Sequence, residues 1–394
     1  MYWENGTRTV PRLNSRYFLL ALGFTIVLGA DRAEAQTVLD WNDFEPCESC
    51  RLEAREFLRL GELQGDGIIE SWIVRVVAAE GRGYLVYGQE GRGGTRFSVF
   101  DEDGTFRATI GREGDGPGEL RNINDLSFTG DDEILILDGQ RRRWITLEDD
   151  GSLVADVPLG EITPGRFRLV EGDTVAVMGV MGRRPSTVGY PLHLVGVRDG
   201  EPRRHFGSGD PESWSAMRPY AGTLVLGESS LLQVGDAVWW AEVGRPQVEK
   251  WSLDGTPRLR ITGELDWFPV PDLAARRSAG VPPLPTTASL AVDDEARLWL
   301  LTSVPGEDWR DVELVGPERA VPPEERDTWR DVRLDVFDLA RRRHVGTLRL
   351  DSTSAQLLVL RGEVLLYQLE YETPVWPRVV LYQVHLLDDP QSRR

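Results

Sequence analysis

Only two cysteines occur in the chain, Cys47 and Cys50, and their C-x-x-C spacing suits three kinds of chemistry. A thioredoxin-like redox pair needs its first cysteine at the start of a helix in an α/β fold, whereas this sequence is β-patterned. A zinc site needs two further ligands, and the sequence holds no second C-x-x-C and no H-x₃-H. Arg51 rather than histidine follows Cys50, which argues against c-type haem attachment. We therefore expect a local disulfide of modest stabilising effect.

Other residues with catalytic or metal-binding chemistry are scattered along the chain. The four histidines form no metal-ligand pair: His193, His205, His344 and His385. No G-x-S-x-G motif supplies a serine nucleophile. The acidic segments 101–104 and 148–151 resemble short calcium loops, but they lack the glutamate that closes an EF-hand loop. We read them as turns and predict no metal and no cofactor.

The glycine-rich segment 111–126, GREGDGPGELRNINDL, could in principle cradle a phosphate. A P-loop carries a lysine followed by serine or threonine and leads into a helix, and this segment has neither feature. Its glycines instead permit a sharp change of chain direction. We interpret the segment as a linker between two structural units.

Two inserts carry the residues that we predict to bind a ligand. Residues 267–287 are rich in proline and alanine, and residues 304–330 are rich in proline and charge. In the second insert, WRDVEL at 309–314 recurs as WRDVRL at 329–334, which indicates either a hairpin or a flap. The candidate binding residues are Trp267, Phe268, Trp309 and Trp329. The alternative is that these rings pack the inserts onto the fold.

The elements that position these residues are set by a phrase that recurs about every fifty residues. Each copy alternates apolar and polar residues, the period of a β-strand, and the stronger copies end in Asp-Gly, a hairpin signal. The copies are RFSVFDEDG at 96–104, RWITLEDDG at 143–151, LHLVGVRDG at 192–200, QVEKWSLDG at 247–255, and weaker ones from 333 and 378. We interpret each copy as the third strand of a four-stranded antiparallel unit.

The neighbouring strands follow from the same phrase. Two apolar strands precede a copy, as in 133–138 and 236–241, and a fourth strand ending in glycine follows it. We expect the fourth strands over 106–110, 153–159, 203–206 and 258–262. The last copy is followed only by Asp-Asp-Pro and the chain end, so its unit lacks an outer strand. Residues 56–61, EFLRLG, resemble such a strand, and we predict that they close the ring.

The segment from 111 to 143 resembles the NHL-type six-bladed β-propellers, which have a TolB-like architecture. Asp138 and Arg143 match that family's aspartate followed by an arginine five residues later, although Trp144 replaces the usual isoleucine and Leu120 the usual phenylalanine. The arginine recurs at Arg96, Arg333 and Arg378. The resemblance implies an all-β, six-bladed propeller. Its known members are mostly scaffolds that bind protein or nucleic acid, with a minority of lyase-type enzymes, so the fold alone selects no function.

Composition and the N-terminus limit the location and the partners. The net charge is −19, with 64 acidic and 45 basic residues, which disfavours nucleic acid and anionic lipid. Three arginines precede an apolar run from 17 to 30 that is too short to span a membrane, and Ala33-Glu34-Ala35 follows. This pattern predicts a signal peptide over 1–35, cleaved near Ala35, and a periplasmic or extracellular protein without a membrane span. An uncleaved anchor is the alternative.

The sequence therefore predicts four regions: the signal peptide, an N-terminal segment over 36–55 with the two cysteines, the propeller over 56–388, and a tail over 389–394. We expect a monomeric binding or scaffold module of the cell envelope that engages a protein, peptide or glycan. A propeller lyase or hydrolase with a site at the channel mouth is the alternative. Histidine and carboxylate side chains converging at the channel would favour the enzyme, and an exposed aromatic patch would favour binding.

Overall fold

The computed structural model describes residues 36–69, 74–88, 94–130, 132–160, 162–170, 172–181, 192–207, 231–234, 236–242, 244–268, 283–309, 330–351, 355–370 and 377–387. The chain divides into two units between Glu34 and Ala35, and all described residues belong to the second unit. Within them, the structure contains no helix with the length and apolarity needed to cross a membrane.

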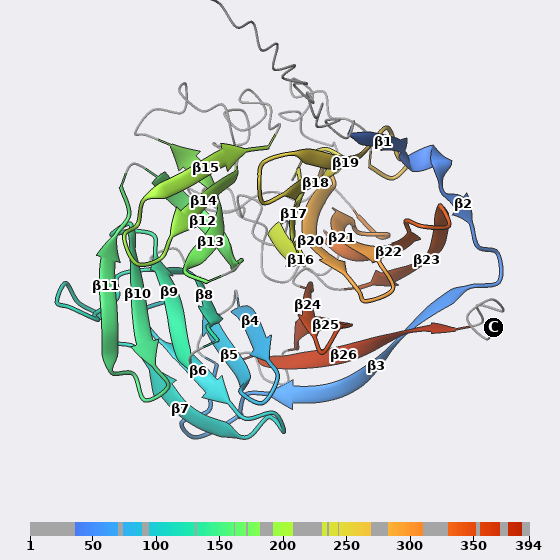
Figure 1. Cartoon of the computed structure of the whole chain (residues 1–394). Helices are drawn as coiled ribbons and strands as arrows, with labels where there is room; N and C mark the ends of the chain where they lie inside the picture. The colour runs from blue at the N-terminus through green and yellow to red at the C-terminus, as the bar shows by residue number, and fades with distance from the viewer. Residues whose placement is uncertain are drawn as a thin grey trace, which may run out of the picture. The chain divides into compact units, whose positions relative to one another are not determined.

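The described residues form six antiparallel sheets of four strands, two of which gain a fifth strand (Figure 1). Blades 1 to 3 consist of consecutive strands: β4 (Val74–Ala79), β5 (Gly83–Gly88), β6 (Phe97–Phe100) and β7 (Phe106–Ile110); β8 (Ile123–Phe128), β9 (Glu133–Asp138), β10 (Arg143–Glu148) and β11 (Leu153–Pro158); β12 (Ile162–Leu169), β13 (Thr174–Met181), β14 (Leu192–Gly196) and β15 (Pro202–Phe206). The six-bladed propeller predicted from the repeat is confirmed.

Blades 4 to 6 incorporate strands from the N-terminus. They contain β16 (Leu231–Val234), β17 (Ala237–Ala241), β18 (Val248–Ser252), β19 (Pro257–Thr262) and β1 (Thr37–Asp40); β20 (Thr286–Val292), β21 (Arg297–Pro305), β22 (Arg330–Asp338), β23 (Arg343–Leu350) and β2 (Glu45–Pro46); β24 (Gln356–Leu360), β25 (Glu363–Glu370), β26 (Arg378–Leu387) and β3 (Arg51–Leu60). Each repeated phrase is the third strand of its blade, as expected.

The alternation of each strand builds the core between blades. On β5, Leu85 and Tyr87 pack toward blade 2, whereas Tyr84 and Val86 pack toward blade 6. Six hydrophobic clusters of this kind, among the described side chains, each join two neighbouring blades. The inner strands β4, β8, β12, β16, β20 and β24 also contact one another in that order, and β24 contacts β4 (Figure 1). The ring is therefore closed at its centre as well as between its blades.

The outer strand of blade 6 comes from the N-terminus, as predicted. β3 pairs antiparallel with β26 from Arg51↔Leu387 to Leu60↔Val379 (Figure 1). The strand begins at Arg51, earlier than the expected Glu56, because its partner β26 is ten residues long. It ends at Leu60, and the following Gly61 has φ +95°, a conformation that glycine adopts without steric cost. Blade 6 is thus completed by the two ends of the chain.

Residues 36–50 form an N-terminal strap that the sequence did not predict. β1 adds a parallel strand to β19, and β2 adds a parallel strand to β23. Between them a 3₁₀ turn, η1 (Trp41–Asp43), is capped by Asp40 and buries Trp41 against Phe337 of blade 5. The strap therefore joins the outer edges of blades 4 and 5 before the chain enters blade 6.

Candidate functional site

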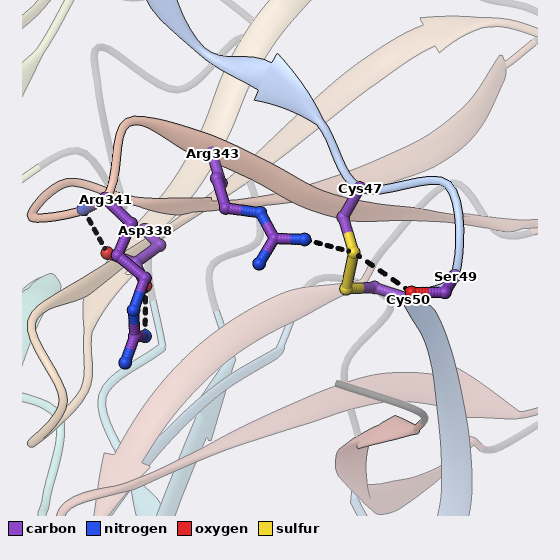
Figure 2. Close-up of a disulfide and its surroundings, with 6 residues drawn as sticks. All are labelled: Cys47, Ser49, Cys50, Asp338, Arg341 and Arg343. Carbon is purple, nitrogen blue, oxygen red and sulfur yellow. Dashed lines mark hydrogen bonds and ion pairs between the residues drawn. A yellow bond between two sulfur atoms is a disulfide. The ribbon is translucent and has the colours of Figure 1, made fainter. Parts of the chain in front are cut away.

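The cysteines lie where the strap passes into β3, and they form the predicted disulfide, Cys47–Cys50. Figure 2 shows Arg343 of β23 pointing toward it, and the Arg343 Nη2–H donates to Cys47 Sγ at 2.9 Å. Asp338, also drawn there, accepts hydrogen bonds from Arg341 and so orders the turn before β23. The disulfide thus fixes the turn from the strap into β3.

Three of the four predicted aromatic residues, Trp267, Phe268 and Trp309, lie within the described part of the chain, and they differ in burial. The Arg333 guanidinium lies 4.4 Å from the centroid of the Trp267 ring, which is half-buried. Phe268 is 0% exposed, so this residue is not available for contact with a ligand; it packs beside Trp267 at a centroid distance of 5.9 Å. Trp309 is half-buried just after β21, and Trp329 lies outside the described residues. The packing alternative therefore holds for Phe268.

The repeated arginines, which occur in blades 1, 2, 5 and 6, do not converge. Arg143 bonds to Asp156 across its own blade, Arg333 bonds to Asp335 two residues along β22, and Arg378 donates to the Gly61 carbonyl of the closing strand at 3.2 Å. Arg96 is exposed. These side chains hold strands and connections together, and they form no common anion site.

The glycine-rich segment satisfies its own hydrogen bonds. Glu119 Oε2 accepts the Gly116 N–H at 2.7 Å, and the Leu120 N–H donates to the Arg112 carbonyl at 2.7 Å. The backbone hydrogen bond from Gly116 is the main cause that lowers the pKa of Glu119. Leu120 is buried in the core between blades 1 and 2. The Glu119 carboxylate thus accepts a backbone N–H that a phosphate would otherwise use, which supports the linker interpretation.

A different set of residues, not singled out from the sequence, meets near the centre of the ring. This central cluster is drawn from four blades: Arg75 (β4) and Tyr87 (β5), Asp125 (β8), Arg166 and Arg168 (β12), and Tyr367 (β25). Arg75, Asp125 and Arg166 are 5%, 3% and 2% exposed. Arg75 lies opposite Tyr87 in the register of β4 and β5. The first and second strands of these blades thus bring together polar groups that are spread along the chain from Arg75 to Tyr367.

Asp125 connects three of these blades. Its Oδ1 accepts the Tyr87 hydroxyl at 2.8 Å and lies 3.3 Å from Arg166 Nη1. Its Oδ2 accepts the Phe167 N–H at 3.0 Å and Arg168 Nη1 at 3.2 Å. Both oxygens are therefore engaged by donors from blades 1 and 3, so that one carboxylate serves two guanidinium groups.

Arg166 reaches from blade 3 across blade 2 to blade 1. Its Nη1 donates to the Tyr87 hydroxyl at 2.8 Å and to the Asn124 carbonyl at 2.6 Å. Burial lowers the pKa of Arg166, but the nearby oxygens of Tyr87 and Asp125 raise it overall. Its guanidinium is therefore held in the charged form by oxygen acceptors inside the protein.

The pKa of Arg75 is shifted in the opposite direction from that of Arg166. Burial, and then the positive charge of Arg166, lower the pKa of Arg75 to about 9. Burial likewise raises the pKa of Tyr87 and of Tyr367, which keeps both hydroxyls neutral. Tyr367 accepts the Val76 N–H at 3.3 Å and so ties blade 6 to the strand that carries Arg75. The cluster is cationic among the described residues.

Irregular backbone re-aims two of the cluster side chains. The pairing register shifts between Ile123 and Asp125 on β8, and between Pro164 and Arg166 on β12. Such bulges turn the following side chain and occur often beside functional sites. Asp125 and Arg166 each follow directly after such a shift. The two neighbouring inner strands thus depart from regular pairing at the residues that form the cluster.

The cluster offers guanidinium and hydroxyl donors, which suit the binding of ligand oxygens. Among the described residues, no group of three or more His, Cys, Asp or Glu side chains is placed to hold a metal ion. A charged residue inside an otherwise apolar inner strand, as in WIVRVV and INDLSF, was the sequence signal for this site. It occurs on three successive inner strands, β4, β8 and β12, so it becomes meaningful only once the strands are aligned by blade.

Comparison with known proteins agrees with the fold. Residues 92–153 match the family DUF5128, described as a 6-bladed beta-propeller. No curated protein matches the chain. A DUF4221 member from Bacteroides vulgatus is similar with a TM-score of 0.56 at 9% identity, covering 86% of this chain and 99% of its own. A second structure, from Bacteroides fragilis, has a TM-score of 0.52 at 10% identity and covers 90% of this chain and 100% of its own. Sheet topology and comparisons together identify a six-bladed β-propeller.

Proposed function

We propose that this chain is an exported binding module of the cell envelope, and that its ligand lies against the central cluster. One observation carries the proposal: buried polar side chains from four blades meet at one place. Burying such groups costs free energy, so a fold that only needed stability would fill this place with apolar residues. Polar groups that converge inside a rigid scaffold are typical of binding sites.

Two observations support export. The Cys47–Cys50 disulfide is typical of an oxidising compartment. The similar structure from Bacteroides fragilis belongs to a protein predicted to be exported. The ligand classes that we propose remain a protein, a peptide or a glycan of the envelope, bound by a monomer.

The NHL type is part of this proposal. Arg143 Nε lies 3.8 Å from Asp138 Oδ2, and the two residues are paired opposite each other on β10 and β9, which suits the structural role of that motif. An enzyme would have been favoured by histidines and several carboxylates at the channel. The described cluster holds one carboxylate, Asp125, and no histidine, and the proposal assigns its residues a binding role.

The test measures whether ligands bind at the cluster. The purified protein is screened by thermal shift against neutral oligosaccharides, peptides and small anions, and each hit is repeated with Tyr367→Phe and Arg168→Gln. Hits that weaken at least tenfold in both variants support the proposal. The proposal would be overturned if neither variant weakens any hit, or if no compound of any class binds. Trp309→Ala serves as a control for binding at the second insert instead.

A further inference from the structure

We propose that the Cys47–Cys50 disulfide is a thiol–disulfide exchange site, which thiols reduce while the propeller stays folded. The site lies between the N-terminal strap and β3, and the proposal is independent of ligand binding at the central cluster. Both cysteines are half-buried, and Glu48 and Ser49 between them are exposed. Figure 2 shows the two sulfur atoms near Ser49 and the guanidinium of Arg343. This surface position allows a thiol in solution to approach.

The chain on either side of the disulfide is held by other contacts. Before it, β2 pairs with β23, and the Cys47 N–H donates to the His344 carbonyl at 2.9 Å. After it, β3 begins at once with the pair Arg51↔Leu387. The disulfide joins residues only three positions apart, so it removes little conformational entropy from the unfolded chain. It therefore adds little to the stability of the fold.

This small effect on folding has a reciprocal consequence for reduction. Linked equilibria share one coupling free energy, so a disulfide that stabilises a fold only slightly is protected from reduction by that fold only slightly. Exposed disulfides are accordingly more easily reduced than structural ones. Reduction of Cys47 and Cys50 should thus proceed in the folded protein.

Arg343 favours Cys47 as the sulfur that leaves. Its Nη2–H donates to Cys47 Sγ at 2.9 Å. When the S–S bond breaks, this sulfur departs as a thiolate, and a hydrogen bond from a guanidinium stabilises a thiolate more than a thiol. One guanidinium has five N–H donors, so Arg343 serves other partners at the same time without losing this bond. In thioredoxin-like sites the start of a helix gives such stabilisation, and here a side chain on a strand gives it.

The other charged groups near Cys47 act on it less directly. The charged residues of the turn and of the neighbouring strand ends are exposed to water: Glu45, Glu48, Arg51 and Arg342. Their charges are screened by solvent and salt. The His344 Nε2 lies 2.9 Å from Asp335 Oδ1, so this imidazole is engaged by that carboxylate. Arg343 is therefore the side chain whose removal should change the chemistry of Cys47 most.

The exchange balances in two steps. A thiolate attacks Cys50 Sγ and bonds to it, and the electron pair of the Cys47–Cys50 bond leaves with Cys47 Sγ. A second thiolate then attacks the sulfur of the first thiol in the mixed disulfide, and Cys50 leaves as a thiolate. Two thiols are thereby oxidised to one disulfide, and the two cysteines are reduced. The protons that the thiols release go to the cysteines or to the solvent.

The first experiment exposes the folded protein to reduced glutathione, alkylates the resulting thiols with a maleimide and counts them by intact mass. We expect both cysteines to be reduced, while the melting temperature falls by less than about 4 °C. A larger fall would show that the disulfide is structural and would overturn the proposal. A disulfide that glutathione reduces only after urea has unfolded the protein would overturn it as well.

The second experiment measures the pKa of Cys47 from the pH profile of its alkylation in Cys50→Ser, where it is the single thiol. We expect a midpoint at least about one unit below the ordinary value near 8.5. Adding Arg343→Met should return the midpoint to about 8.5, and adding Arg343→Lys, which keeps a cationic donor, should retain part of the shift. Arg342→Met is the matched control, because it removes the same charge from an exposed neighbour and should leave the midpoint low. Equal midpoints with Arg343→Met and Arg342→Met would refute the role of Arg343.

Discussion

Arg143 and Arg166 are both almost completely buried, yet the described charged residues around them differ. Arg143 lies in the second blade with Asp156 and Asp138 beside it, so two carboxylates face one guanidinium. Arg166 lies at the centre with Arg75 and Arg168 nearby, and Asp125 is the carboxylate that the described residues of the cluster provide. The difference shows that one buried arginine can stabilise the fold, while another can be positioned by the fold for a role in binding.

The same contrast extends to a group that we call the blade arginines. Each has a carboxylate partner within its own or the next blade: Arg82 with Asp149, Arg143 with Asp156, Arg297 with Asp293 and Arg333 with Asp335. Arg82 also lies 4.4 Å from the centroid of the Phe128 ring, and so links the first hairpin of blade 1 to blade 2. Removing a blade arginine should therefore cost stability alone, whereas, under the proposed function, removing a central one should also weaken ligand binding.

The largest effect is expected for Asp125→Asn. The amide is nearly the same size, but its NH₂ group would face donors, and the guanidinium groups would lose their shared carboxylate. Breaking a buried charged pair in this way costs about 3–5 kcal/mol. Urea unfolding at pH 7 measures the change, with the exposed Asp115→Asn as a control that should alter stability little. A loss below about 1 kcal/mol would mean that the central charges are balanced by other means.

A smaller effect is expected for Asp335→Asn in blade 5. Asp335 accepts from Arg333 and Thr347 and bonds His344 Nε2 at 2.9 Å, and Arg333 retains contact with Trp267 after the change. We expect a loss of about 2 kcal/mol at pH 7.

The pH dependence of this loss has a definite sign. Burial would raise the pKa of Asp335, but hydrogen bonds from His344, Arg333 and Thr347 lower it overall. A lowered folded-state pKa gives stability that is present above the unfolded value near 3.9 and is lost as the pH falls through the folded value. Urea unfolding at pH 5 and 3 should therefore show a narrower gap in unfolding free energy between the two proteins at pH 3 than at pH 5. If the difference in unfolding free energy did not change with pH, Asp335 would not stabilise the protein through its ionised form.

The smallest effect is expected for the pair of Arg82 and Asp149. Asp149 is partly exposed, and Arg82 also donates to the backbone carbonyls of Thr129 and Glu133. A double-mutant cycle with Arg82→Met and Asp149→Ala should give a coupling energy of about 0.5–1 kcal/mol. A coupling as large as the loss in Asp125→Asn would remove the distinction between the two sets of arginines.

Local patterns in the sequence predicted most of the blades. The Asp-Gly turn after β10 and the alternation before it place the third strand, and β7 runs from Phe106 to Ile110 as expected. The closing strand was also predictable, because residues 56–61 have the form of an outer strand without a blade of their own. These features depend on neighbours in sequence, where the period of two and the turn residues are informative.

The strap and the central cluster depend on contacts that no local pattern reports. β1 has four residues and β2 has two, too few to show a period, and their partners are β19 and β23 far along the chain. Arg75, Asp125 and Arg166 come together only after the blades close. Aromatic residues in the inserts were easier to recognise in the sequence as candidate binding residues. Phe268, however, is buried and packs within the fold.

The strap and β3 have a consequence for how the protein is made. Thr37 pairs with Leu259, Glu45 with Arg343 and Arg51 with Leu387, so the first described strands to be synthesised find partners that are synthesised much later. Contacts between such distant residues form slowly, and unpaired strand edges are prone to aggregate while they wait. A nascent chain stopped before residue 378 would lack the partner of its closing strand, and its ring would stay open however well its first blades had formed.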